Sequence, residues 1–272
     1  MIRALFRKIL AFFWRDFAIE TSYRSNFILQ LAETLFTVAS FYYLSGFVES
    51  PRLLQSLPAG KTYFAFAIVG VAFFDYMTVA MNAFDQSLED ARRNGALEAL
   101  LVTGTSVPVI LAGSVVYPFV LLSLRTAVYL GWAAFLFGFS AAGANWPGAA
   151  AVLLASVLSF TGLGILSASY MLLFKRGNPA KWLLLGASSV LGGMMYPVSV
   201  LPHALRIISR LLPVTYSLEG LRSAVLAGAG FGILWPSIRA LLLFAVVLLP
   251  VSFAVFSWAL RRTRITGTLT HF

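Results

Sequence analysis

The stretch from residue 63 to residue 84 reads YFAFAIVGVAFFDYMTVAMNAF, and Asp75 is its only charged residue. A helical run of about 20 apolar residues crosses the ~30 Å hydrocarbon layer of a bilayer. The whole chain has this character, because 60% of its 272 residues are hydrophobic, only 11% are charged and the mean hydropathy is +0.86. So few charges cannot cover a water-soluble surface. The composition therefore predicts an all-α integral membrane protein.

Five other apolar runs have comparable lengths, so we predict six transmembrane helices within a single transmembrane domain, residues 1–272. The six predicted spans are residues 27–47, 63–84, about 108–139, 149–174, 182–200 and 237–260. Most of the 20 Lys and Arg residues fall on the side that an N-terminus-inside arrangement assigns to the cytoplasm. We expect a multi-pass protein of the cell inner (cytoplasmic) membrane with both termini cytoplasmic. This topology accounts for the net charge of +10 without any nucleic-acid partner.

Residues 1–24 precede the first predicted span and combine basic with apolar side chains at helical spacing. Arg3, Arg7 and Arg15 fall on one helical face, and bulky apolar residues such as Phe6 and Phe13 fall on the other. This pattern predicts an N-terminal amphipathic interfacial helix whose basic face meets anionic membrane lipids. Two roles remain open for this helix, a membrane-surface anchor and a docking element for a cytosolic partner.

Between the second and third predicted spans lies a cytoplasmic loop, residues 85–107, that contains QSLEDARRNGALEALLVTGTS. Leu97, Leu100 and Leu101 share one helical stripe, whereas Arg93 and Glu98 face elsewhere. The apolar side of such an element can bind a partner, and the charged side can make the binding specific. The alternative is an ordinary solvated connector.

Another unusual region, residues 197–228, reads PVSVLPHALRIISRLLPVTYSLEGLRSAVLAG. It contains two helical pieces split by Pro213, and neither piece is long enough to cross a membrane. We predict a broken extracellular re-entrant hairpin, residues 201–228, that dips into the outer leaflet before the last span. Glu219 and Arg222 lie within helical reach of each other and can pair or share a polar face. The alternative is an extracellular amphipathic cap without a transport role.

Three charged residues fall inside the predicted spans, Glu33, Asp75 and Arg125. Each costs at least ~2.5 kcal/mol at the middle of a membrane if it is unpaired, so all three should face protein or water. We predict a structural pair between Asp75 and Arg125. In a different class of protein, a secondary transporter, Glu33 and Asp75 would bind protons or cations. Such a transporter would have matching broken helices in both halves, and the sequence indicates a break only in the second half.

The first predicted span carries a semi-polar stripe at spacings near three and four, formed by Gln30, Glu33, Thr34, Thr37 and Ser40. Such a stripe is costly against lipid, so we expect it on the transport pathway or at an interface between subunits. Six spans also leave little room to enclose a large amphiphile within one chain. We therefore expect two copies to pack together with the pathway between them.

The chain offers little for catalysis, since it has no cysteine and only two histidines. Its single Gly-Lys-Thr, in AGKT at residues 59–62, lacks the first glycine of a phosphate loop because Gln55 stands at that position. We therefore expect no catalytic, cofactor-binding or metal site and no enzymatic activity in this chain. A membrane-embedded enzyme is disfavoured, because no histidine lies within a predicted span.

The order of these parts resembles that of ABC-2 type permeases, the membrane subunits of ATP-driven exporters, over essentially the whole chain. One motif that carries the resemblance is Gly-x-Leu-Glu-x-Leu-Leu, at Gly95, Leu97, Glu98, Leu100 and Leu101. The stronger motif is a series of residues that resembles the pattern of these permeases in the same order over some thirty positions. It consists of Tyr196, Pro197, Pro202, Pro213, Tyr216, Leu221, Arg222 and Gly228. One departure lies after the paired leucines, where the family often has a proline and this chain has Thr103-Gly104-Thr105-Ser106.

The resemblance implies a role for each of these regions. The first loop would contact the nucleotide-binding subunit through Arg93, Gly95, Leu97, Glu98, Leu100 and Leu101. The outer hairpin, with Pro202, Pro213, Tyr216, Glu219 and Arg222, would close the extracellular end of the pathway. The expected assembly is a homodimer of permeases with two copies of a cytosolic ABC ATPase subunit, and that partner would hold ATP and magnesium. The expected function is outward movement of a lipid-linked, polysaccharide or amphipathic drug-like substrate, and a proton- or cation-coupled secondary transporter is the alternative.

Overall fold

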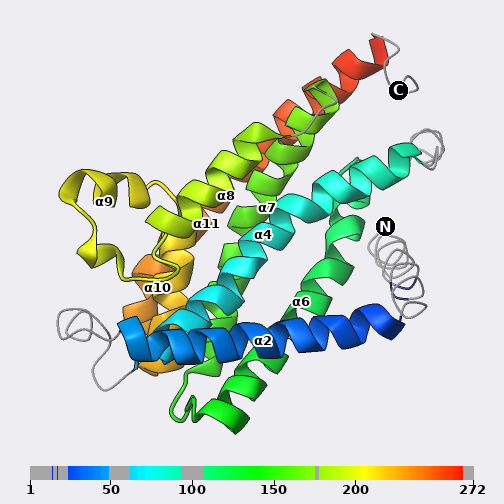
Figure 1. The fold of residues 1–272 in the computed structure, drawn as a ribbon. Coiled ribbons are helices and arrows are strands. Elements are labelled where there is room, and N and C mark those ends of the chain that lie inside the picture. The colour runs from blue at the N-terminus through cyan, green and yellow to red at the C-terminus, as the bar shows by residue number, and fades with distance from the viewer. Residues whose placement is uncertain are drawn as a thin grey trace.

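The computed structural model of the chain describes Trp14, Phe17 and residues 24–48, 62–93, 107–174 and 178–265. Its regular elements over residues 24–265 are all helical, eight α-helices and one turn of 3₁₀ helix, which confirms the all-α prediction for the described part (Figure 1). In chain order the elements are α2 (Arg24–Val48), α4 (Tyr63–Arg93), α6 (Val107–Phe137), α7 (Trp146–Phe174), α8 (Pro179–Leu191), η1 (Val198–Val200), α9 (His203–Ser209), α10 (Pro213–Leu226) and α11 (Phe231–Ile265).

Five of the described helices are long and apolar enough to cross a membrane, which agrees with a multi-pass membrane protein. Their apolar stretches are Ile28–Val48, Tyr63–Gln86, Val116–Phe137, Trp146–Phe174 and Phe231–Thr263. Each of them overlaps one of the predicted spans. The long third run is one helix, α6, whose membrane-length part begins only at Val116.

The predicted fifth span, residues 182–200, is not one continuous helix. Helix α8 has 13 residues, which rise only about 20 Å, and it ends at Leu191. Gly192 caps this end, and Gly193 then adopts a φ of +80°, a left-handed conformation that glycine reaches without steric cost. Apolar composition alone therefore overestimated the length of this span, because residues 192–197 are apolar but turn the chain away from the helix axis.

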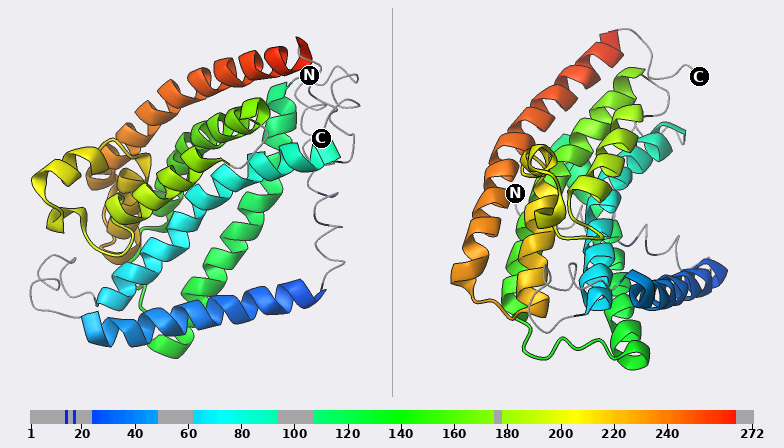
Figure 2. Two further views of the ribbon diagram at one scale, coloured as in Figure 1. Left: turned by 45° about the horizontal axis from the view of Figure 1, so that its top comes forward. Right: turned by 60° about the vertical axis from the view of Figure 1, so that its left-hand side comes forward.

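The helices run between two ends of the bundle (Figures 1 and 2). At one end, which we call the first-loop end, α4 and α7 finish, α6 and α8 begin, and α11 finishes. At the opposite end, the hairpin end, lie α9, α10 and the start of α11. Helix α11 finishes at the first-loop end, whereas α2 runs obliquely across the side of the bundle (Figures 1 and 2).

Helix α4 forms the centre of the bundle, because 83% of its membrane-length stretch is buried, against 17% for α2. Ile68, Met77 and Phe84 of α4 are fully buried. Helix α7 packs against both α4 and α11, and α2 lies obliquely at the edge beside α4 and α6 (Figures 1 and 2). Helix α4 also continues to Arg93, so residues 85–93 of the predicted cytoplasmic loop extend this central helix.

The predicted hairpin, residues 201–228, contains α9 and α10 and follows η1 directly, and its helical break falls at Pro213 as the sequence indicated. Pro213 stands in the first turn of α10, where its missing N–H removes no helical hydrogen bond. Most residues of α10 are buried in the bundle, whereas α9 protrudes and leaves its Ile207 and Ile208, and Leu211 in the turn after it, exposed (Figure 1).

The two loops at the hairpin end are joined through Asn145. Its Nδ2 donates to the Ala229 carbonyl at 2.7 Å, and its Oδ1 accepts from the Gly148 N–H at 2.9 Å. Gly228 has a φ of +61°, and a Cβ there would collide with the Gly143 carbonyl. The last glycine of the sequence motif is therefore required by backbone conformation and by close packing.

The contact between α4 and α7 gives a test of this packing at Gly164. A Cβ at Gly164 would collide with the Ala80 carbonyl oxygen and the Phe84 ring. Overpacking costs about 1–3 kcal/mol, which outweighs the gain of up to about 1 kcal/mol in helix propensity. We therefore expect Gly164→Ala to lower the thermal unfolding midpoint of the purified protein in detergent. Gly186→Ala on α8 is the matched control, because a Cβ there would meet nothing within 4 Å beyond its chain neighbours and the backbone of its own helix. Equal midpoints for the two variants would contradict this account of the packing.

Candidate functional site

Two charged residues from different helices meet at the edge of the bundle. Arg125 of α6 donates from Nη2 to Oε1 of Glu33 on α2 at 2.9 Å, and also to the Tyr129 hydroxyl at 3.3 Å. The predicted pair of Asp75 with Arg125 is therefore replaced by a pair of Glu33 with Arg125. The sequence could not decide between these partners, because the choice depends on which helix lies next to α6.

The pair of Glu33 with Arg125 lies at the surface of the single chain, since the two side chains are 59% and 29% exposed. Both belong to stretches that are long and apolar enough to cross a membrane. Charged groups at this depth face water or protein rather than lipid. The exposed side of this pair therefore requires a water-filled space or a second protein surface beside α2.

The other members of the predicted stripe on α2 are placed around this pair. Ser40 is exposed and Thr37 is half-buried, with its hydroxyl donating to the Glu33 carbonyl at 2.8 Å. Gln30 is half-buried and lines a cavity of about 100 Å³ between α2 and α6, together with Thr34 and Arg125. The structure thus places the stripe partly against α6 and partly on the open side of α2.

A larger cavity, of about 480 Å³, opens at the hairpin-end termini of α2 and α6. Aromatic rings and hydroxyl groups line it side by side, and its lining residues are Tyr42, Tyr43, Ser45, Gly46, Thr62, Phe64, Ala65, Phe137, Gly138, Phe139 and Ser140. Tyr42 packs against Phe64 and Phe137 at ring-centroid distances of 5.5 and 4.7 Å. The cavity can therefore accept a molecule that has both apolar and polar parts.

Arg222 of α10 is buried, with 5% of its surface exposed, and it is bonded to backbone carbonyls. Its Nη1 donates to the Gly193 carbonyl at 2.6 Å, its Nη2 to the Met194 carbonyl at 2.5 Å, and its Nε to the Phe66 carbonyl at 3.2 Å. The guanidinium also stacks on the Phe66 ring, with Cζ 3.4 Å from the centroid. One side chain thus joins α10, the segment after α8 and α4.

Two features allow this buried cation. Gly70 of α4 has no side chain, and a Cβ there would collide with both Arg222 and the Met194 carbonyl. Burial lowers the pKa of Arg222 to about 9, so the guanidinium still carries its charge at neutral pH. Glu219, which the sequence suggested as a partner of Arg222, is exposed instead. The hydrogen bonds of the Arg222 guanidinium go to backbone carbonyls and not to the Glu219 carboxylate.

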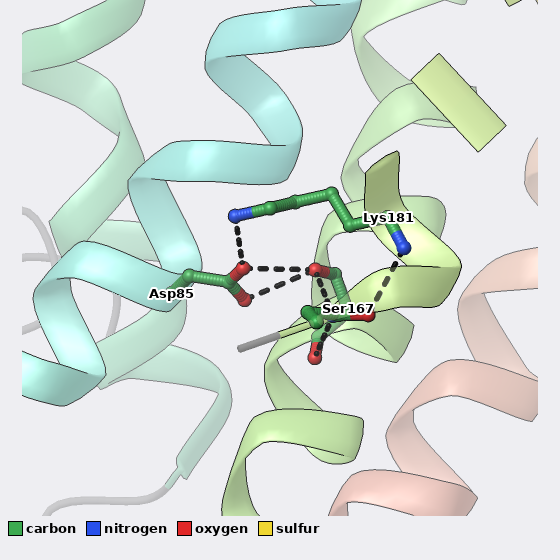
Figure 3. A network of polar contacts seen from close by, with 4 residues as sticks. Asp85, Ser167 and Lys181 are labelled. Carbon is green, nitrogen blue, oxygen red and sulfur yellow. Dashed lines mark hydrogen bonds and ion pairs between the residues drawn. The ribbon is translucent and has the colours of Figure 1, made fainter. Parts of the chain in front are cut away.

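A second polar cluster lies near the first-loop end and joins α4, α7 and α8 (Figure 3). Lys181 Nζ of α8 lies 2.7 Å from Oδ2 of Asp85 on α4, and the Ser167 hydroxyl of α7 donates to both carboxylate oxygens at 3.0 and 3.1 Å. Asn178 donates from Nδ2 to the Ser167 hydroxyl at 2.9 Å, and its Oδ1 caps α8 by accepting from the Lys181 N–H. Asp85 is 4% exposed, so this carboxylate is a buried and fully bonded charge.

Sequence reasoning did not find this cluster. Asn178 followed by Pro179 is a helix-start pattern and could have placed the beginning of α8. In the sequence Lys181 was one of the basic residues that the topology places on the cytoplasmic side, and Asp85 was the first residue of the predicted cytoplasmic loop, residues 85–107. Neither assignment could show that the two side chains meet, because 96 residues separate them in the chain.

Several predicted site residues fall outside what the structure describes. Gly95, Leu97, Glu98, Leu100 and Leu101 belong to this group, so their role at a partner ATPase stays a prediction. Arg93 is the last residue of α4, and its side chain is likewise not described. The predicted interfacial helix is described only at Trp14 and Phe17, whose exposed rings meet edge to face at 5.7 Å.

The remaining predicted hairpin residues have structural contacts. Pro202 precedes the first residue of α9 as its N-cap, and Tyr216 on α10 packs against Phe244 of α11 at 6.0 Å. Thr215, next to Tyr216, donates its hydroxyl to the Ser209 carbonyl at 2.7 Å and so fixes the turn between α9 and α10. These contacts hold the hairpin on the bundle.

The new pairing of Arg125 leads to a thermodynamic test. Contacting residues show non-additive effects of at least about 0.5 kcal/mol in a double-mutant cycle. We expect Glu33→Ala combined with Arg125→Leu to destabilise the protein less than the sum of the single changes, in thermal or chemical unfolding in detergent. The comparison cycle combines Asp75→Ala with Arg125→Leu and should be closer to additive. A larger coupling for Asp75 than for Glu33 would show that the native pair is the one predicted from the sequence.

Comparison with known proteins places the chain in a family. The family model described as ABC-2 type transporter matches residues 7–226. The linearmycin resistance permease protein LnrN of Bacillus subtilis (strain 168) is 30% identical over 166 residues, which is 59% of this chain and 41% of LnrN. The uncharacterized protein YhgE of the same organism is 32% identical over 109 residues, which is 38% of this chain and 13% of YhgE.

The chain thus spans less than half the length of both relatives. The family match, by contrast, extends from the region of the predicted interfacial helix to the last residue of α10. It includes the first-loop motif and almost the whole of the hairpin series that carry the resemblance in the sequence. Because this match covers most of the 272 residues, the chain belongs to the ABC-2 type transporter family.

Proposed function

We propose that this chain is the permease subunit of an ATP-driven exporter that moves its substrate outward. The match to the ABC-2 type transporter family over residues 7–226 carries this proposal. In this scheme the chain itself hydrolyses nothing and holds no cofactor. A separate nucleotide-binding subunit binds ATP with magnesium and supplies the energy.

The proposed docking site for two cytosolic ABC ATPase subunits is the segment from Arg93 to Leu101 in each of two permease copies. Helix α4 supports this assignment, because it runs as one helix from the buried centre of the bundle to Arg93, directly before the segment. A force applied to the segment would therefore reach the bundle centre without passing through a flexible joint. The charged and apolar residues of the segment, Glu98 and the paired leucines, would provide the contact.

The proposed assembly is a homodimer with the transport pathway beside α2. This helix is only 17% buried over its membrane-length stretch, and it carries the exposed Glu33 and Ser40. A half-exposed ion pair and a hydroxyl stripe fit a water-filled pathway or a second copy better than they fit lipid. The outer hairpin would close this pathway at the hairpin end.

Among the three substrate classes that the sequence left open, we favour an amphipathic, drug-like molecule over a lipid-linked or polysaccharide cargo. The cavity of about 480 Å³ with Tyr42, Tyr43 and Phe64 beside hydroxyl groups supports this choice. The similarity to a protein named as a linearmycin resistance permease points the same way. A contribution to drug resistance is therefore the cellular role that we propose.

The proposed location is the inner (cytoplasmic) membrane with both termini in the cytoplasm. The distribution of Lys and Arg supports this orientation, and α11 finishes at the same end of the bundle as α4, which leads into the predicted cytoplasmic loop (Figure 1). Proton- or cation-coupled secondary transport through Glu33 and Asp75 is the less favoured alternative. The Arg125 guanidinium already neutralises Glu33, so only Asp75 would remain to bind the coupling ion.

The docking assignment is tested by reversing a charge in the first loop. We expect Glu98→Lys to abolish ATP-dependent transport and co-purification of the cognate ATPase, because it places a cation where the interface requires an anion. Thermal stability should stay near that of the native protein, since no membrane-length helix changes. Glu49→Lys, between α2 and α4, is the matched control and should leave both readouts unchanged.

If Glu98→Lys leaves both ATPase binding and transport unchanged, the ATPase does not dock at this position. Transport that continues without ATP but requires a proton gradient would contradict the exporter as a whole and support the secondary transporter.

The dimer assignment is tested with single cysteines, since the native chain has none. We expect cysteines at Thr37 or Ser40 to form a cross-linked dimer, or to change their labelling rate with nucleotide or substrate, because both positions lie on the open side of α2. A cysteine at Val247, on the exposed face of α11, is the control and should label only with lipid-phase reagents. The same lipid-only labelling at Thr37 and Ser40 would place the α2 stripe against lipid and exclude it from the pathway.

A further inference from the structure

Helix α8 is held in the bundle in an unusual way. Ser188 is its only buried residue, whereas Trp182, Leu183 and Val190 are all more than half exposed. Only Leu184 and Leu185 of α8 pack against the main apolar core, and both are partly exposed, so apolar packing holds α8 less firmly than it holds α4, α7 and α11. Polar contacts at its two ends add to this packing.

The contact at the beginning of α8 is the cluster around Asp85. Lys181, in the first turn of α8, binds the Asp85 carboxylate of α4 at 2.7 Å, and Ser167 supports this carboxylate from α7 (Figure 3). The cap of α8 belongs to the same cluster, because Asn178 bonds both to the Lys181 N–H and to the Ser167 hydroxyl. Helix α8 therefore begins at a point fixed to α4.

The contact beyond the other end of α8 is the guanidinium of Arg222. It binds the Gly193 and Met194 carbonyls just after α8, and the Phe66 carbonyl of α4. The Cβ-free surface of Gly70 lets the guanidinium and the Met194 carbonyl approach α4 closely. The chain leaving α8 is therefore also fixed to α4, and α10 is bound at the same point.

These two contacts lie far apart along α4. Phe66 and Asp85 are separated by 19 positions, which at a rise of 1.5 Å per residue is about 28 Å. Helix α8 alone rises about 20 Å. Two fixed points at this separation determine both the position and the tilt of α8 relative to α4, which a single contact could not do.

We propose that α8 acts as a strut that transmits movement of α4 to the outer hairpin, with Asp85, Lys181 and Arg222 as its positioning residues. Movement imposed on α4 beyond Asp85, at its Arg93 end, would pass through the ion pair into α8 and through Arg222 into α10. This inference rests on the proposed function, because it assumes that a partner ATPase moves the segment after Arg93. The two polar contacts themselves do not depend on that assumption.

A first experiment tests the two contacts in the purified chain alone, without any ATPase. Spin labels at Gln86 and Leu183 measure the distance between α4 and the beginning of α8. Labels at Val190 and Ile233 measure the distance between the end of α8 and the beginning of α11. All four positions are exposed. We expect Lys181→Met to broaden only the first distance distribution and Arg222→Met to broaden only the second.

The control variants separate this local effect from a general loss of structure. Arg239→Met removes an exposed cation from α11 and should change neither distribution. The exchange of Asp85→Lys with Lys181→Asp should restore the first distribution at least in part, because it rebuilds the ion pair. Unchanged distributions in both Lys181→Met and Arg222→Met would overturn the strut, and so would equal broadening of both distributions by either variant.

A second experiment adds the cognate ATPase and ATP to the same labelled proteins. We expect ATP to shift the distance between Val190 and Ile233 in the native chain, and we expect this shift to fall at least several-fold in Lys181→Met while ATPase binding persists. An undiminished shift in Lys181→Met would overturn the transmission route. If the native chain binds no ATPase and ATP causes no shift, the proposed function fails, whereas the first experiment still decides whether the contacts fix α8.

Discussion

The guanidinium of Arg222 donates hydrogen bonds to the backbone carbonyls that follow the end of helix α8. Helix α8 stops at Leu191, and the carbonyls that follow it have no place in a helical hydrogen-bond ladder. Unpaired backbone groups are costly at membrane depth, so irregular backbone is stable there only when protein or water supplies partners. Arg222 supplies these partners to Gly193 and Met194 and adds a bond to Phe66. Without such a donor, α8, the hairpin and α4 would lack a common attachment point.

The helices differ in how firmly side-chain packing holds them in the bundle. Helices α4, α7 and α11 pack through apolar side chains and through glycines that allow close backbone approach, as at Gly164. Helix α2 has little such packing, and α8 is held by polar bonds at its ends. A bundle with a firmly packed centre and lightly packed edges can change shape at the edges without unfolding. Both lightly packed helices carry the groups that we assign to transport, the stripe on α2 and the two contacts of α8.

The sequence predicted the helical pattern well because hydrocarbon thickness imposes a length on every span. It correctly indicated five membrane-length helices, the break at Pro213 and the separation of a short hairpin from the last span. It failed at residues 182–200, where Gly192 and Gly193 end α8 although the composition remains apolar. Helical spacing also put Thr34 on the same semi-polar stripe of α2 as Ser40, whereas the structure buries Thr34 and exposes Ser40.

Composition and residue order thus determined, by themselves, that the chain crosses a membrane as helices, roughly where most of those helices lie, and which family motifs it carries. Tertiary structure alone decided which charges meet. Arg125 binds Glu33 rather than Asp75, Arg222 binds carbonyls rather than Glu219, and Asp85 binds Lys181 from across 96 residues. The physical reason is that hydrophobicity acts locally along each helix and is set by its own residues, whereas an ion pair forms only after the neighbours of each helix and its rotation have been fixed by packing.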